Sequence, residues 1–305
     1  MKKIIIFFII LFITIITFSL FISYQNFFKN IIETLNIWLY KVYPSIFAFY
    51  ILGSLLINTN ILNKIIYLLQ PLLKRLKFSS EKTLNIFIIS IFIGNPSSSL
   101  LISESLDKGE ITNNDAHNLL KCSSFLNPLF MYSFLIKFHI QYIYLIIIIH
   151  LLSNFIIARL INRNNSNTII NNTNVFFSLD SLLGSINSIV QLLLLISGIM
   201  VFANIFKYSL NCCLNYFQIN HLFLKFLTAN IEIAGGLHSI INLHLSEGLS
   251  LSLISFICAF GGFSIHLQVI SVIRKHHLSY RIFFQYRLIQ AVIGIILFLL
   301  IYQIK

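Results

Sequence analysis

Charged residues are scarce in this sequence: Asp, Glu, Lys and Arg make up 10% of its 305 residues. Globular chains carry roughly 25%, so a soluble fold of this composition could not cover its surface with polar side chains. A soluble enzyme is therefore excluded. Hydrophobic residues make up 57% of the chain, and the mean hydropathy is +0.88. This composition predicts a polytopic membrane protein.

Cysteine is also scarce, with four residues that lie in or beside apolar stretches. Cys212 and Cys213 are adjacent and so poorly placed to pair, and no CxxC, HExxH or Cys/His cluster occurs. The sequence therefore predicts no disulfide framework, no metal site and no cofactor. The net charge is +12, but no long polar basic segment carries it. We expect basic cytoplasmic loop ends rather than nucleic-acid binding.

Several apolar segments are long enough to predict membrane spans. Lys2 and Lys3 precede the first, which is longer than the apolar core of a signal peptide and has no small-residue cleavage site after it. Residues 61–73 are too short to span and are followed by basic residues, which predicts a helix at the cytoplasmic interface. The predicted spans are 4–22, 34–57, 116–136, 139–158, 182–206 and 282–302.

Two further apolar segments are interrupted near their middle, the first by Gly94-Asn95-Pro96 and the second by Gly261-Gly262. Short arms around a Gly or Pro break are typical of re-entrant hairpins, which enter and leave the membrane on one side. We therefore expect an all-α membrane protein with two such hairpins. The arms are 84–93 and 97–102 in the first segment, and 249–260 and 263–273 in the second.

The two halves of the chain share this plan, which predicts an internal repeat. Basic clusters at 2–3, 74–77 and 159–163 share the cytoplasmic side if the first hairpin enters from inside. The second hairpin then enters from outside, so we expect inverted repeats. This topology places the basic cluster at 274–281 outside, against the positive-inside tendency.

The broken segments contain the candidate substrate contacts. A helix that begins inside the membrane presents unsatisfied N–H groups that attract anions, and serines can cap it. The glycine pairs would let the backbone approach a substrate, but they are also typical of close helix packing. His266 is either a substrate contact or a histidine packed between helices. Asn127-Pro128 is a further helix break. The candidate contacts are Asn95, Ser97, Ser98, Ser99, Asn127, Gly235, Gly236, Gly261, Gly262, Ser264, His266 and Gln268.

Glu232 is the one acidic residue within the apolar stretch 227–234. A charged side chain there costs a few kcal/mol on insertion scales, so it must be protonated, paired or facing water. Lys225 lies seven residues earlier, two turns along the same helical face, and is a candidate partner. We therefore expect either a structural ion pair or a carboxylate that couples transport to an ion.

Three motifs together resemble the YlbJ-type sporulation integral membrane proteins, a family with nucleoside-recognition (Gate) repeats. Residues 94–131, GNPSSSLLISESLDKGEITNNDAHNLLKCSSFLNPLFM, resemble the core motif of the family. ANIEIAGG (229–236) resembles its L-E-I-T-x-G element, and AFGGFSIHLQVISVI (259–273) resembles its GFGG-x-S-x-H-x-Q-V element. The family tip usually reads G-Y-P-x-G-A-K, whereas this chain has Asn95, Ser98 and Leu100 at the varied positions.

The resemblance implies a fold similar to concentrative nucleoside transporters. It also implies a protein of the mother-cell membrane around the forespore that moves dipicolinic acid, a small aromatic dicarboxylate, towards the spore without covalent chemistry. A nucleoside transporter and a non-transporting scaffold for other sporulation membrane proteins are the alternatives. The expected units are an N-terminal transmembrane helix (1–33), a first Gate-like repeat (34–162), a polar Asn-rich linker (163–181) and a second Gate-like repeat (182–305).

Overall fold

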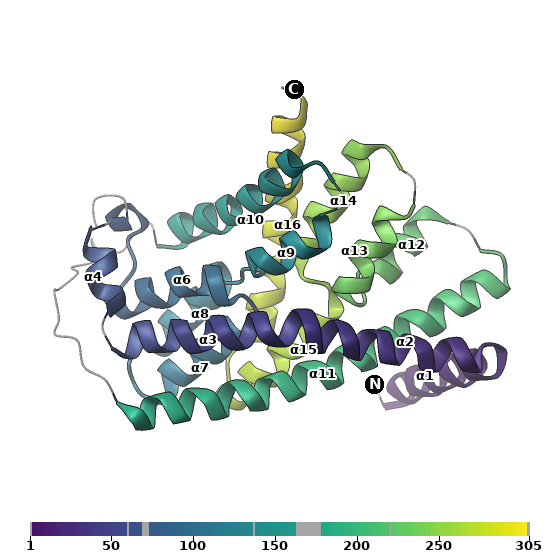
Figure 1. Cartoon of the computed structure of the whole chain (residues 1–305), viewed down its shortest axis with the longest axis horizontal. Helices are drawn as coiled ribbons and strands as arrows, with labels where there is room; N and C mark the ends of the chain where they lie inside the picture. The colour runs from purple at the N-terminus through teal and green to yellow at the C-terminus, as the bar shows by residue number, and fades with distance from the viewer. Residues whose placement is uncertain are drawn as a thin grey trace.

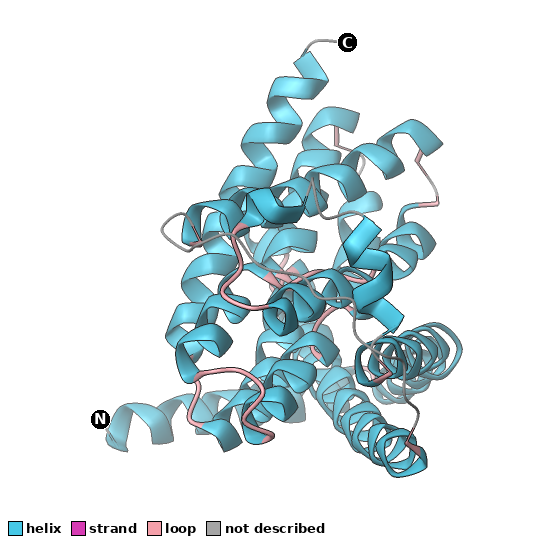
Figure 2. Cartoon of the chain, turned by 90° about the vertical axis from the view of Figure 1, so that its left-hand side faces the viewer, coloured by secondary structure: helices cyan, strands magenta, loops and turns pink. Residues whose placement is uncertain are grey.

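The protein is entirely helical in the part that the structure describes (Figure 2). This computed structural model describes residues 2–59, 61–68, 73–136, 138–162, 178–219, 221–243 and 245–303. The expected all-α fold is confirmed over these residues. Residues 163–177 of the predicted linker lie outside the described residues.

Five helical segments of the described chain are long and apolar enough to cross a membrane. Two predicted spans are found almost unchanged, as α10 (Ile140–Ile161) and α16 (Tyr280–Gln303). A third, α11 (Leu179–Tyr216), is much longer than its predicted range. The five segments are Tyr24–Asn58, Ile140–Ile161, Leu179–Tyr216, Glu247–His276 and Tyr280–Tyr302.

The N-terminal helices pack along α11 (Figure 1). Apolar rings and hydroxyl pairs join them, including a 2.8 Å hydrogen bond between Ser19 and Ser209. The indole of Trp38 donates to the carbonyl of Leu193 at 3.1 Å. These helices are α1 (Lys2–Ile22), α2 (Tyr24–Ile37), a π-helical turn (Trp38–Val42) and α3 (Tyr43–Asn58), followed by the short α4 (Ile61–Leu68) within the predicted interfacial segment.

The first interrupted segment is a helical hairpin of α6 (Glu81–Ile93) and α7 (Ser97–Asp107). Ser80 begins α6 by accepting a hydrogen bond from the backbone N–H of Thr83. The arms pack against each other, and a 2.7 Å ion pair from Lys82 to Glu110 joins their outer ends. The chain therefore reverses at the predicted break and returns to the end where it entered.

The predicted span 116–136 is two helices rather than one, α8 (Asn113–Cys122) and α9 (Pro128–Leu135). Residues 123–127 between them are not helical. The physical reason is the dipeptide Asn127-Pro128: proline has no backbone N–H to donate, and the asparagine side chain begins a new helix.

The second hairpin lies earlier in the chain than the sequence predicts. It is formed by α12 (Leu222–Ala229) and α13 (Ile233–Ile241), which pack against each other. The arms expected to form it, α14 (Glu247–Phe260) and α15 (Gly262–Ile273), follow one another at different heights beside α16 (Figure 1). Gly261 and Gly262 interrupt the helix with φ values of +91° and +66° but do not fold its arms together. The segment is a broken helix, not a hairpin.

The same order of elements therefore occurs twice: a hairpin, a broken helix and a long helix. The first set is α6–α7, α8–α9 and α10, and the second is α12–α13, α14–α15 and α16. Because α14–α15 is not a hairpin, the loop after α15 meets the outer end of the first hairpin. His276 Nδ1 lies 2.7 Å from Asp107 Oδ1, and Ser279 N donates to His117 Nε2 at 3.2 Å. The sequence predicted that the loop after α7 and the loop after α15 lie on opposite sides of the membrane. Their contact places both at the same end of the protein.

Candidate functional site

The first hairpin tip is held against the break between α8 and α9. The N–H of Asn95 donates to the carbonyl of Phe125 at 2.8 Å. The Asn127 side chain donates to the carbonyl of Phe92 at 2.7 Å and accepts from the N–H groups of Leu129 and Phe130 at 2.9 and 3.2 Å. Asn127 therefore caps α9 and binds the end of α6 at once, which fixes the tip relative to the broken helix.

The three serines after the tip form the first turn of α7 and are buried. Pro96, not a serine, is the N-cap of α7 and makes no side-chain cap hydrogen bond. Ser98 and Ser99 instead donate to Asn95 Oδ1 at 2.5 and 3.1 Å. The hydroxyl of Ser97 is buried without a hydrogen-bond partner among the described residues. The serines thus orient Asn95 rather than cap the helix.

The second tip is held against the second broken helix in the same way. The carbonyls of Asn230 and Ile231 accept from the N–H groups of Phe263 and Ser264 at 2.6 and 2.9 Å. A Cβ on Gly262 would lie 3.1 Å from the carbonyl of Asn230, so glycine permits this close approach. In both halves, backbone hydrogen bonds join the hairpin tip to the region of the break in the next helix.

Glu232 is 2% exposed and begins α13. Its Oε1 accepts from the N–H of Ala234 at 3.0 Å, and its Oε2 accepts from that of Gly235 at 2.6 Å. Both oxygens are therefore used at a helix N-terminus, where the helix dipole also favours a negative charge.

Lys225 is not the cation that faces Glu232. No ion pair joins the two within the described chain, and Lys225 lines a separate cavity with Asn215. The facing cation is Lys207 of α11. Its Nζ and Glu232 Oε2 lie 2.6 and 3.1 Å from the point where a Cβ on Gly235 would sit. No spacing in the sequence indicated this proximity, because α11 and α13 are separate elements.

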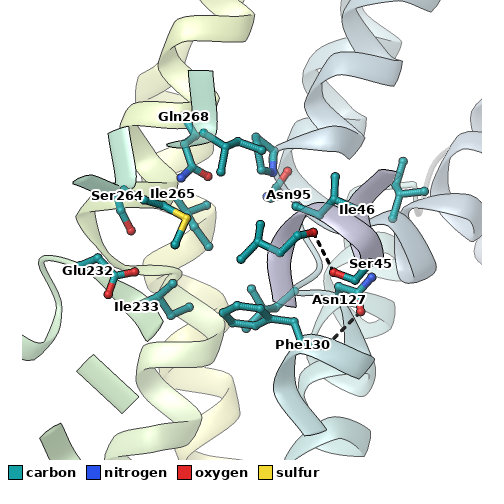
Figure 3. A pocket seen from close by; sticks show the side chains of 16 residues that line it. Ser45, Ile46, Asn95, Asn127, Phe130, Glu232, Ile233, Ser264, Ile265 and Gln268 are labelled. Atoms are coloured by element: carbon teal, nitrogen blue, oxygen red, sulfur yellow. Dashed lines mark hydrogen bonds between the residues drawn. The ribbon is translucent and has the colours of Figure 1, made fainter. Parts of the chain in front are cut away.

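The two tips and both broken helices surround one small central cavity of about 40 Å³ (Figure 3). Asn95 and Asn127 from the first half face Glu232, Ser264 and Gln268 from the second half across it. The remaining lining is almost wholly apolar: Val42, Ser45, Ile46, Ile93, Pro96, Leu126, Phe130, Ile196, Met200, Ile233 and Ile265.

Two polar groups at this cavity have no hydrogen-bond partner among the described residues. They are the buried hydroxyl of Ser264 and the side-chain amide of Gln268. Polar groups buried in protein are normally hydrogen-bonded, so these are available to a ligand. Five predicted residues thus meet here: Asn95, Asn127, Glu232, Ser264 and Gln268.

The other candidate contacts lie outside this lining. His266 is packed, with its ring nitrogens 3.0 Å from Tyr280 Oη and from the carbonyl of Phe260. A Cβ on Gly236 would lie 1.9 Å from the carbonyl of Ala229, so this glycine serves hairpin packing. Those not in the lining are Ser97, Ser98, Ser99, Gly235, Gly236, Gly261, Gly262 and His266.

Arg287 of α16 was not singled out from the sequence, although a lone charge in a predicted span is a signal. It is 2% exposed and donates to the carbonyls of Ser124 and Lys121 at 2.6 and 2.9 Å. It also contacts Gln290, whose amide lies 3.4 Å from His150. His150 Nε2 in turn accepts from the N–H of Leu126 at 2.8 Å. This network holds the unwound residues between α8 and α9.

The cavity offers hydrogen-bonding amides, a hydroxyl and a carboxylate. In the described part of the chain, no three His, Cys, Asp or Glu side chains come together as a metal site would require. The arrangement fits non-covalent binding of a small polar molecule between two hairpin tips.

No protein-family model and no solved structure matches the sequence. Among curated proteins, the chain is similar to the sporulation integral membrane protein YlbJ of Bacillus subtilis (strain 168). The two are 23% identical over 309 residues, which cover 88% of this chain and 76% of the relative. With five helices long and apolar enough to cross a bilayer, the chain is an integral membrane protein and a distant relative of a sporulation protein.

Proposed function

We propose that this protein is a transporter that moves a small aromatic dicarboxylate, dipicolinic acid, across the mother-cell membrane towards the forespore. The observation that carries the proposal is the meeting of two hairpin tips at one cavity, each tip hydrogen-bonded to a broken helix. Paired broken elements around a central site are the arrangement that secondary transporters use. The repeats are inverted and the hairpins re-entrant in this proposal, as in concentrative nucleoside transporters.

The transport cycle needs no covalent chemistry. The carboxylates and ring of the substrate would exchange hydrogen bonds with water for those with Asn95, Ser264 and Gln268. A cavity of about 40 Å³ is far smaller than the 300–1,000 Å³ of typical ligand pockets, so the described state is a closed one. The tips must part from each other for the substrate to enter.

Uptake into proteoliposomes tests the proposal directly. We expect labelled dipicolinate, but not a labelled nucleoside, to enter vesicles that contain the protein. Gln268→Leu and Ser264→Ala should reduce uptake at least tenfold, since each removes a free polar group from the cavity. Gln191→Leu is the matched control, because this glutamine is exposed on α11 away from the cavity.

Two results would replace the proposal. Nucleoside uptake that depends on Gln268 would make the protein a nucleoside-type transporter. No uptake of either compound, with normal sporulation in cells that carry the Gln268 variant, would favour a non-transporting scaffold for other sporulation membrane proteins.

Glu232 is the proposed ion-coupling residue, because it is the carboxylate at the cavity. Glu232→Gln removes the titratable group and leaves one acceptor oxygen for two N–H groups. The variant should lose about 1 kcal/mol of stability, bind substrate, and fail to concentrate it. Concentrative uptake at the wild-type level would remove Glu232 from the coupling mechanism. Adding Lys225→Met should change nothing, since that lysine lies elsewhere.

A further inference from the structure

A second and larger cavity lies next to the central one. Its volume is about 530 Å³, within the usual range for small-molecule sites. Four elements line both cavities: Val42, Phe130, Met200 and Ile233 face the central cavity, and other residues of the same elements face the larger one. We call the larger cavity the vestibule. It is lined by Asn30, Glu33, Thr34, Ile37, Lys41, Ser133, Phe134, Ile136, Asn204, Lys207, Tyr208, Asn211, Ala234, Gly235, His238 and Ser239.

The lining of the vestibule mixes polar and apolar residues and carries more positive than negative charge. Lys41 and Lys207 face one acidic residue, Glu33, and several amides and hydroxyls complete the wall. Lys41 is exposed, and its Nζ lies 4.7 Å from the ring centroid of Phe134. A cavity of this kind attracts small anions.

Lys207 is the buried cation of the vestibule, at 6% exposure. Its Nζ makes no hydrogen bond or ion pair within 4 Å in the described chain, while both oxygens of Glu232 are used by the N–H groups of α13. A buried ammonium without a direct partner is costly, and a carboxylate in the vestibule would offset this cost. Gly235 leaves the space between the two charged groups open.

We propose that the vestibule binds a small carboxylate anion, with the Lys207 ammonium as its principal contact, before the anion reaches the central cavity. This inference rests on the proposed transport function and adds a residue and a route to it.

Binding to the full chain in lipid nanodiscs tests the inference separately from transport. The probes are dipicolinate and its uncharged diamide, pyridine-2,6-dicarboxamide. The binding of each probe is measured by calorimetry. We expect Lys207→Met to weaken dipicolinate binding at least tenfold and Lys207→Arg to retain most of it. Lys225→Met is the matched control and should bind as the wild type does. The diamide should bind weakly and equally to all four proteins.

A variant that leaves Lys207 in place guards against a folding defect. Ser133→Phe adds a ring to the vestibule wall and should weaken dipicolinate binding by narrowing the space. Wild-type affinity in both Lys207→Met and Ser133→Phe would overturn the inference, as would equal binding of the diamide or no dipicolinate binding by the wild type. Uptake that still depends on Gln268 in any of these cases would leave the transport proposal standing.

Discussion

At the scale of single residues, glycines mark the places where backbone meets backbone. Gly94 has a φ of +66°, and a Cβ there would lie 2.7 Å from the N atom of Asn127. Gly236 packs against the carbonyl of Ala229 within the second hairpin. At these contacts, two backbone segments approach each other more closely than a side chain on either glycine would permit.

Gly236→Ala should destabilise the second hairpin. The added Cβ would overlap the carbonyl of Ala229, so α12 and α13 must move apart. We expect a loss of about 1–3 kcal/mol, as for other overpacked sites, measured by thermal unfolding in detergent. Gly198→Ala on α11 is the control, because nothing lies within 4 Å of its Cβ position. Equal melting temperatures for the two variants would show that the tip relaxes freely.

At the scale of elements, the two broken helices are held open by different means. The second relies on Gly261 and Gly262, which adopt left-handed backbone conformations. The first has Asn127-Pro128 and a buried polar network centred on Arg287. The carbonyls that this arginine satisfies are those freed where α8 ends, so its charge also complements the helix dipole.

Arg287→Met should release the unwound residues 123–127. It leaves the carbonyl of Lys121 without the arginine and the carbonyl of Ser124 with only the 3.4 Å hydrogen bond from Asn154, which costs about 2 kcal/mol. Faster hydrogen exchange at Phe125 and Leu126, together with a lower melting temperature, is the expected result. Arg281→Met is the control, because Arg281 is exposed. Unchanged exchange at these amides would show that Asn127-Pro128 alone holds residues 123–127 in their non-helical conformation.

Asp115 links the starts of α6 and α8. Burial raises the pKa of its carboxyl, but hydrogen bonds from Ser79 (2.5 Å) and Thr112 (2.7 and 3.1 Å) outweigh this and lower the pKa below its usual value. A carboxyl whose folded pKa is lowered stabilises the protein above its unfolded pKa of about 3.9, and the stabilisation is lost as the pH falls.

Asp115→Asn should therefore lower the melting temperature at pH 7, and the difference from the wild type should shrink as the pH falls below about 4. Asp180→Asn is the control, since that residue is exposed. A difference that stays constant from pH 7 to pH 3 would mean that the charge of Asp115 contributes nothing.

At the scale of the whole molecule, the corrected position of the second hairpin also changes the expected topology. The loop after α15 contacts the loop after α7 through His276 and Asp107. The basic cluster at 274–281 therefore lies at the end where the ion pair of Lys82 closes the first hairpin. This arrangement removes the conflict with the positive-inside tendency.

Cysteine labelling in intact cells checks this topology. Lys108→Cys and His277→Cys, in a chain without its native cysteines, should react with an impermeant thiol reagent from the same side of the membrane. Gln218→Cys should react from the opposite side, because α11 is long enough to cross the bilayer before it. Labelling of positions 108 and 277 from different sides would restore the topology expected from sequence.

Features that depend on composition and local chemistry were predictable from the amino-acid sequence. Apolar content and the shortage of charge indicated a membrane protein, and apolar runs located α10 and α16. Local breakers located the first hairpin, where Gly94 and Pro96 stop one helix and begin another. Four predicted contact residues, together with Glu232, line the central cavity.

Which broken segment folds back on itself depends on packing between elements that are distant in the chain. Glycine pairs interrupt a helix in the same way whether the chain then reverses or continues, so the neighbours that each arm packs against settle the outcome. The arms at Gly261 differ in their main neighbour, which is α16 for α14 and α11 for α15, whereas α12 and α13 pack together. The proximity of Lys207 to Glu232 and the capping by Arg287 were equally hidden, because proximity between helices distant in the chain leaves no periodic signal in the sequence.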